Sequence, residues 1–114
     1  MTPFIANIIK QGCPTVDIGA PFIEILQTLA KAHTGTLVVV DKNRKVMGIL
    51  SERDIVRHLS RQKAVESCTA KNLMTKNIIS ADSKVTSSGL MALMVQNNIR
   101  HVPIINDGEL LGLV

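Results

Sequence analysis

The sequence predicts a mixed α+β fold built from two copies of one unit, and three observations carry this prediction. The chain has 114 residues, which is enough for one ordinary domain. Its composition, with 46% hydrophobic and 19% charged residues, is typical of a globular protein and excludes a disordered tail. One order of apolar stripe, short strand, polar turn and second strand occurs twice, about 65 residues apart, which indicates an internal repeat.

The first copy opens with an amphipathic helix, whose apolar residues fall at helical spacing: Ile25, Leu26, Leu29 and Ala32. The β-branched run 36–40 then predicts a strand, and 46–50 follows at hairpin distance as its partner. Ser51 and Asp54 have the spacing of a helix N-cap. The helix that they begin is expected to bury three apolar residues, Ile55, Val56 and Leu59.

The second copy repeats this order with one residue fewer in its turn. Its helix carries Leu90, Leu93 and Met94 at core spacing, and Met91 is also assigned to packing. The strands are expected at 101–106 and 110–114, joined by Asn106, Asp107 and Gly108. We expect neither copy to bury its helix face alone, so that the two share one core. The second copy reaches Val114 without a closing helix, so we expect about 20–30 further residues in a complete unit.

These patterns divide the chain into four parts. Residues 1–14 form an N-terminal segment, 15–63 the first copy, 64–77 a connection with one helical turn near 70–74, and 78–114 the incomplete second copy. The longest apolar run, 90–95, is far shorter than the roughly 20 residues that span a bilayer. Cys13 and Cys68 are too few for a disulfide framework or a zinc site, which favours a cytoplasmic protein.

The positive charge of the chain is concentrated in one segment. Between Lys42 and Lys63 there are seven basic residues and two acidic ones, so this segment carries +5 and the remainder of the chain −1, which together give the net charge of +4. Arg53, Arg57 and Arg61 follow each other at helical spacing and form a basic stripe. Nucleic-acid binding through this stripe is not expected, because the chain has no Trp, no Tyr and only two Phe on which bases could stack.

Three segments resemble a tandem pair of CBS domains, also called a Bateman module. They are Gly48–Arg57, Leu73–Thr75 and Ile99–Gly112, and their order and duplication carry the resemblance more than any single piece. The resemblance covers nearly the whole chain from about Thr15 onward. It implies two β-α-β-β-α repeats related by a pseudo-twofold axis, with clefts for adenosyl ligands, and a regulatory function without catalysis.

The resemblance also implies roles for individual residues. Asp54 would take the ribose hydroxyls and Ser51 the phosphate or ribose, while Arg100 and His101 would reach phosphate from the second copy. Six more residues complete the expected ligand site: Ile49, Lys76, Asn77, Ile78, Ile79 and Arg57. The structural alternatives are a plain capping box at Ser51 and Asp54, a solvated turn at Arg100 and an ordinary edge histidine at His101.

The function expected from these observations is a regulatory module that senses an adenine nucleotide, with AMP ahead of ADP and ATP and with no required cofactor or metal. The alternatives are an NAD(H) or S-adenosylmethionine site, and a homodimerisation scaffold with empty clefts. The expected partners are the adenosyl ligand, a second copy of the chain and an unidentified regulated protein. An enzyme is not expected, because the sequence contains no nucleophile–base pair at recognisable spacing and no glycine-rich phosphate loop. His33 and His58 are expected to be surface residues.

Overall fold

The computed structural model describes residues 2–61 and 64–114, so Lys63 of the basic segment lies outside the described residues. The chain divides into two compact units. The first, here called the central unit, is Pro14–Ile78, and the second, the terminal unit, combines Met1–Cys13 with Ile79–Val114. The chain therefore has a mixed α+β fold, as the sequence predicts. Each unit is described separately below.

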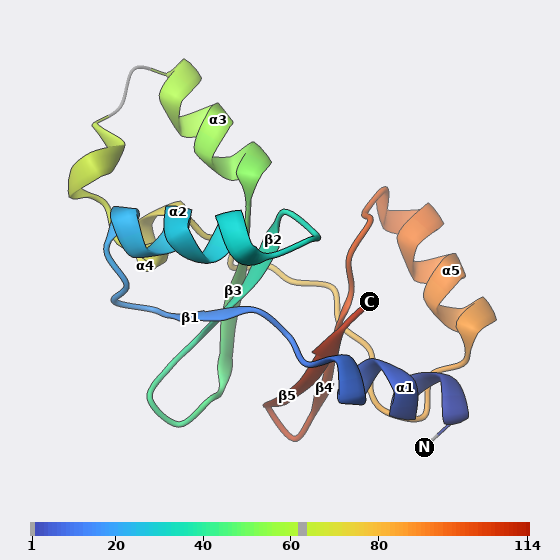
Figure 1. Cartoon of the computed structure of the whole chain (residues 1–114). Helices are drawn as coiled ribbons and strands as arrows, with labels where there is room; N and C mark the ends of the chain where they lie inside the picture. The colour runs from blue at the N-terminus through green and yellow to red at the C-terminus, as the bar shows by residue number, and fades with distance from the viewer. Residues whose placement is uncertain (1, 62–63) are drawn as a thin grey trace. The chain divides into compact units, whose positions relative to one another are not determined.

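The central unit holds a three-stranded sheet and its covering helices (Figure 1). Its elements in order are β1 (Thr15–Asp17), α2 (Phe22–Lys31), β2 (Thr36–Val40), β3 (Val46–Ser51), α3 (Glu52–Ser60), the 3₁₀ turn η1 (Val65–Ser67) and α4 (Ala70–Leu73). β2 is the central strand and pairs in parallel with β1 and antiparallel with β3. The expected helical turn near 70–74 is therefore present as α4.

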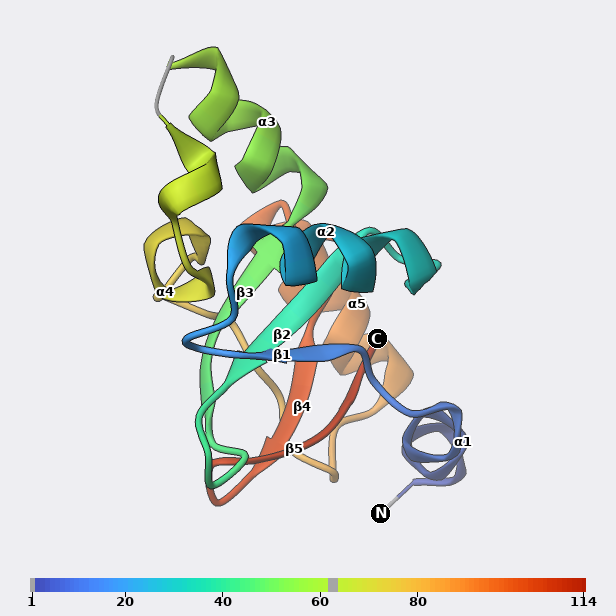
Figure 2. The same cartoon turned by 60° about the vertical axis from the view of Figure 1, so that its left-hand side comes forward.

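The core of the central unit forms where α2 lies against the sheet (Figure 2). Ile25 and Leu29 of α2 are buried with Leu37, Val39 and Leu50 of the two long strands. Leu73 of α4 joins the same cluster. Burial of these side chains removes apolar surface from water, which is the main force that holds the unit together.

The terminal unit contains the helix α1 (Pro3–Gln11), the helix α5 (Ser87–Asn97) and a hairpin of β4 (Pro103–Asn106) and β5 (Glu109–Leu113). Two threonines cap the helices, because Thr2 accepts a hydrogen bond from the Ile5 amide and Thr86 accepts one from the Gly89 amide. Ile5 and Ile8 of α1 are buried with three residues of the second copy: Leu90, Val102 and Ile104. The expected turn is present, with Asp107 at φ 51° and Gly108 at φ 82°.

The backbone repeats in detail between the units. The hairpin register shifts between Val39 and Val40 in one unit and between Ile104 and Ile105 in the other. β2 pairs in parallel with β1, and Ile104 makes the matching parallel bridge with Ala81. Gly48 and Gly112 occupy equivalent places, and each lies against the segment that precedes the other copy: Met74 and Thr75 in one case, Ile8 in the other.

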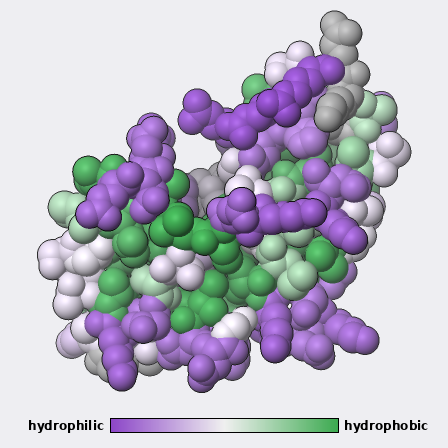
Figure 3. All heavy atoms as spheres, turned by 180° about the vertical axis from the view of Figure 1, so that it is seen from behind, coloured by the Kyte–Doolittle hydropathy of each residue, from purple (hydrophilic) through white to green (hydrophobic). Residues whose placement is uncertain are grey.

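Two packing expectations need correction, and a third stays a prediction. Within the described residues each unit has its own cluster of buried apolar residues, which α4 completes in the central unit and α1 in the terminal unit. A core shared by the two copies stays a prediction. Val56 and Leu59 are 63% and 53% exposed, so only Ile55 of the expected α3 face is buried. Met91 is 66% exposed, whereas Leu90 is buried and Leu93 and Met94 pack against the cluster. Apolar side chains are accordingly visible on the surface (Figure 3).

The histidines outside the expected site differ from each other. His33 is exposed, which confirms the expectation. His58 is only half-buried in α3, but its Nδ1 atom is shielded from solvent and has no hydrogen-bond partner in the described part of the chain. The expectation that His58 is a surface residue is therefore wrong for its Nδ1 atom, which is buried.

Candidate functional site

Ser51 and Asp54 form a capping box at the start of α3. The Ser51 hydroxyl accepts a hydrogen bond from the Asp54 amide at 3.3 Å, and the Asp54 carboxylate accepts one from the Ser51 amide at 2.8 Å. The Ser51 hydroxyl also donates to the same carboxylate oxygen, Oδ2, at 3.1 Å. The structural alternative from the sequence is therefore present, and the motif holds the helix start whether or not a ligand binds.

The carboxylate of Asp54 is the notable chemical group of this corner. Asp54 is only 8% exposed, so it is a buried charged residue. Its Oδ1 atom lies 3.6 Å from Nη1 of Arg57, three residues further along α3. A buried carboxylate needs such compensation, because removal of its charge from water is costly. The two oxygens thus have different surroundings, with Ser51 at Oδ2 and Arg57 at Oδ1.

The remaining expected residues of the central unit lie at or just after the antiparallel bridge between Ile49 and Thr75. Ile49 of β3 exchanges backbone hydrogen bonds with Thr75, at 3.0 and 2.7 Å, which holds the segment after α4 beside the strand. Lys76 and Asn77 follow directly and are exposed, while Ile49 and Ile78 are half-buried. The neighbouring residue Ile79 is exposed and begins the terminal unit. The structure therefore brings Ile49 close to the start of the 76–79 segment.

Arg100 and His101 are adjacent in the terminal unit, between α5 and β4. α5 ends at Asn98, which adopts the left-handed conformation at φ 53° and turns the chain toward the strand. Arg100 is exposed and His101 is half-buried. Burial, and next the positive charge of Arg100, lower the pKa of His101 below its ordinary value of 6.5. His101 is therefore mostly a neutral imidazole at pH 7, able to donate one hydrogen bond.

The ten expected residues divide into a first set of seven in the central unit and a second set of three in the terminal unit. In the first set, Ser51, Asp54 and Arg57 are in direct contact through the capping box and the ion pair. The second set is Ile79, Arg100 and His101. Within the described residues, no cluster of His, Cys, Asp and Glu is arranged to hold a metal ion.

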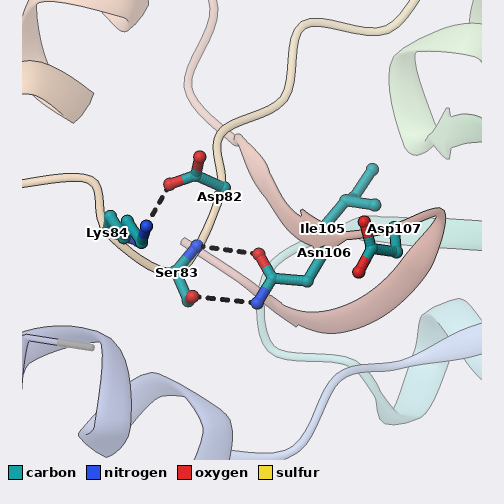
Figure 4. A pocket seen from close by; sticks show the side chains of 6 residues that line it. All are labelled: Asp82, Ser83, Lys84, Ile105, Asn106 and Asp107. Carbon is teal, nitrogen blue, oxygen red and sulfur yellow. Dashed lines mark hydrogen bonds between the residues drawn. The ribbon is translucent and has the colours of Figure 1, made fainter.

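One cavity lies where sequence reasoning placed no function. It has a volume of about 330 Å³ and is lined by six residues of the terminal unit: Asp82, Ser83, Lys84, Ile105, Asn106 and Asp107 (Figure 4). The Asn106 side chain accepts a hydrogen bond from the Ser83 amide and donates one to the Ser83 hydroxyl, so it ties the loop to the hairpin. The sequence signal for this corner is the internal repeat, in which Asp17 and Asp82 occupy equivalent positions. In the structure each of these side chains accepts a hydrogen bond from the backbone amide two residues further along the chain.

Two segments of the chain match the same known protein family. Residues 5–61 and 70–114 each match the family described as CBS domain. The chain belongs to the CBS-domain family. The two matches cover most of the sequence, and the duplicated backbone of the two units is the CBS repeat seen twice. Pairs of CBS domains are in general regulatory modules rather than catalytic domains.

Similar proteins extend this CBS assignment. An uncharacterised protein of Rickettsia prowazekii is 30% identical over 112 residues, which covers 96% of this chain and 34% of that protein. An uncharacterised 17.7 kDa protein of Acidianus ambivalens is 36% identical over 94 residues, covering 80% of this chain and 55% of that one. The chain thus spans about a third to just over half the length of these two relatives.

Solved structures of CBS proteins match the fold. The CBS-domain containing protein ATU1752 from Agrobacterium tumefaciens has a TM-score of 0.82 and 29% identity, covering 96% of this chain and 85% of that chain. The CBS domain pair of protein MJ0100 has a TM-score of 0.83 and 25% identity, covering 96% and 86%. That pair was solved in complex with 5′-methylthioadenosine and S-adenosyl-L-methionine.

The helices of this CBS pair are short. In the described part of the chain, none of them has the length and apolar character that a membrane crossing requires.

Proposed function

We propose that this CBS pair is a non-catalytic regulatory module that binds an adenine nucleotide, with AMP as the leading candidate. The observation that carries the proposal is the buried Asp54 carboxylate at the start of α3, in the motif where the family resemblance expects a ribose ligand. A solved CBS pair with the same fold holds adenosyl ligands, which supports this ligand class. No cofactor or metal is part of the proposal.

The chemistry of the first set of residues suits a ribose. A ribose presents two neighbouring hydroxyl donors, and an ionised carboxylate accepts hydrogen bonds only, so the two match. Ser51 would contact ribose or phosphate by turning its hydroxyl away from the Asp54 carboxylate, which keeps its bond from the Ser51 amide. Ile49, Ile78 and Ile79 would hold the adenine between aliphatic side chains, with Lys76 and Asn77 beside them.

The chemistry of the second set suits a phosphate. Arg100 offers the planar donor fork that matches phosphate oxygens, and the exposed side chain is free to meet a ligand. His101 would add a hydrogen-bond donor. An S-adenosylmethionine ligand has no phosphate and would not need Arg100, which is why AMP is placed ahead of it.

The regulatory mechanism that we propose is a shift of population. A ligand that Asp54 and Arg100 both contact would favour the arrangement of the two repeats in which both contacts form. That arrangement would act on an attached or bound partner protein. A cytoplasmic location stays a prediction, based on the sequence, whose two cysteines are too few for a disulfide framework.

Calorimetric titration of the chain with AMP, ADP, ATP, NADH and S-adenosylmethionine tests this proposal. We expect heat of binding with AMP, and a loss of at least about ten-fold in AMP affinity for Asp54→Asn, because a charged acceptor is lost. Asparagine keeps the capping role, since Asn72 accepts from the Thr69 amide at 2.9 Å in the equivalent box of α4. The variant therefore separates ligand binding from helix capping.

Glu52→Gln is the matched control, because it removes the neighbouring negative charge from the same exposed helix turn. It should leave AMP affinity within about two-fold, as expected for an exposed charge. Absence of binding heat for all five compounds, up to millimolar concentration, would exclude the nucleotide-sensing function. Equal losses in both variants would remove the special role of Asp54.

A second function, homodimerisation through the helices, has support from the exposed apolar side chains. Six of these lie in pairs on three helices: Ile23 and Leu26 on α2, Val56 and Leu59 on α3, Met91 and Val95 on α5. Helix faces of this kind commonly become buried between subunits. We propose that a second copy of the chain covers them, with or without a nucleotide bound.

Light scattering after gel filtration tests the dimer. The unaltered chain is expected to have the mass of a dimer, and Val56→Glu with Leu59→Glu is expected to give a monomer, because two buried charges would have no partners. Met47→Glu, at a partly exposed apolar residue of β3, should leave the dimer intact. A monomeric unaltered chain would contradict the dimer and leave the nucleotide proposal standing.

A further inference from the structure

The ion pair between Arg57 and Asp54 limits how a ligand can reach the carboxylate. Oδ2 of Asp54 already accepts hydrogen bonds from the amide and the hydroxyl of Ser51, at 2.8 and 3.1 Å. The other oxygen, Oδ1, lies 3.6 Å from Nη1 of Arg57. Even when the Ser51 hydroxyl turns to the ligand, Oδ2 keeps its bond from the Ser51 amide, so a ribose that donates to both carboxylate oxygens must also approach Oδ1, where the guanidinium of Arg57 lies.

Arg57 is free to leave that place. Its side chain is 51% exposed, whereas the Asp54 side chain is 11% exposed, so the arginine is the partner that can move into solvent. A half-exposed ion pair in water contributes little to stability, because solvent screens it. A ribose can therefore displace Arg57 from Oδ1 without a large loss of stability.

The displaced guanidinium stays close to the ligand. Its Nη1 atom starts 3.6 Å from Oδ1 of Asp54, the oxygen to which the ribose would donate. The 5′-phosphorus of a nucleotide is joined to the ribose ring through C5′ and O5′, which a long, exposed arginine side chain can reach across. Arginine pairs with phosphate oxygens through a planar fork of donors, which gives shorter and stronger bonds than neutral pairs. A nucleotide thus offers Arg57 a new anion in place of Asp54, and a nucleoside does not.

Helix geometry distinguishes Arg57 from the neighbouring arginine of the basic stripe. Residues three apart in a helix face each other, while adjacent residues do not. Arg57 is three residues after Asp54 and forms the ion pair, whereas Arg53 is adjacent to Asp54 and points to a different side of α3. Both are exposed and carry the same charge, so Arg53 is a matched control.

We propose that Arg57 is a specificity-determining residue of the nucleotide site: it pairs with Asp54 in the unliganded chain and moves to the phosphate when a nucleotide binds. This inference rests on the proposed function, because it needs the ribose of a ligand at Asp54. It assigns to Arg57 the discrimination between a nucleotide and the corresponding nucleoside.

Titration of the unaltered chain, Arg57→Gln and Arg53→Gln with AMP and with adenosine tests this role. For Arg57→Gln, we expect AMP affinity to fall about ten-fold, since a charge-assisted bond is lost, and adenosine affinity to stay equal or rise slightly. Arg53→Gln should change neither affinity by more than about two-fold. Far-ultraviolet circular dichroism and thermal unfolding of each variant check that the helix is intact.

The outcomes separate the two proposals. If the unaltered chain binds neither compound, the proposed function is wrong. If it binds AMP but Arg57→Gln weakens AMP and adenosine equally, or not at all, the role of Arg57 is wrong and the nucleotide site stands. Equal effects of Arg57→Gln and Arg53→Gln would also overturn the role, because they would indicate a general effect of positive charge.

Discussion

At the scale of single residues, His101 is a group whose protonation responds to pH near neutrality. Burial and the adjacent charge of Arg100 lower its pKa below the ordinary 6.5, so the folded chain favours the neutral imidazole. As pH falls below 6.5, the unfolded chain binds this proton before the folded chain does. The free energy of unfolding therefore decreases as pH falls through 6.5, and this decrease ends once pH is below the folded-state pKa.

Proton NMR titration of the histidine ring signals measures this directly. We expect His101 to titrate with a midpoint below 6.5 in the unaltered chain, and with a higher midpoint in Arg100→Gln, because one of the two causes is removed. A midpoint at or above 6.5 in the unaltered chain would contradict the described burial of this side chain. Comparison of the two proteins also separates the effect of charge from the effect of burial.

Single residues also show which expectations the sequence alone could support and which it could not. The capping box of Ser51 and Asp54 could be predicted because both partners lie within one helix turn, so no distant contact decides it. Met91 could not be placed in this way. Met91 is next to the buried Leu90 on the same helix. Helical spacing shows which residues share a face, but it does not show how much of that face the packed residues of the unit cover.

At the scale of the elements, Gly48 fixes how closely β3 approaches the segment after α4. A Cβ atom at this position would lie 2.7 Å from Sδ of Met74 and 2.7 Å from the carbonyl oxygen of Thr75. The side chain of Met74 can move, but Thr75 is held by its backbone bonds to Ile49. Gly48→Ala is therefore expected to lower the free energy of unfolding by about 1–3 kcal/mol, as overpacking does.

Urea unfolding of Gly48→Ala and Gly19→Ala checks this expectation. In Gly19→Ala the nearest atom to the new Cβ is 3.2 Å away and belongs to the Asp17 side chain, so the loss should be smaller. If Gly48→Ala were as stable as Gly19→Ala, the close approach of Thr75 to β3 would be wrong. The sequence predicted both strands and the turn of α4, but not this contact, because it joins segments that are distant in sequence.

At the scale of the whole molecule, each unit contains a helix that belongs to the other family match. α1 lies largely within the 5–61 match and completes the core of the terminal unit, and α4 begins the 70–114 match and completes the core of the central unit. The duplication could be recognised from the sequence, since both copies share turn and strand patterns. This exchange of helices could not be recognised from the sequence. The periodicity of α1 shows which of its faces is apolar, but not which sheet that face packs against.

Two core substitutions test the division into units. Ile5→Ala in α1 and Leu37→Ala in β2 each truncate a side chain that is fully buried, and each should cost about 2–5 kcal/mol. Hydrogen exchange should rise mainly in residues 79–114 for the first variant and mainly in 14–78 for the second. The same increase across the whole chain in both variants would contradict two separately packed cores.

The most direct measurement for the sensor proposal is a titration of the isotope-labelled chain with AMP, followed by the backbone amide signals of each repeat. We expect the amides of residues 52–54 and those of Arg100 and His101 to shift together, with one common midpoint. Shifts in only one of these two groups, or none with AMP at millimolar concentration, would contradict a ligand that both repeats hold.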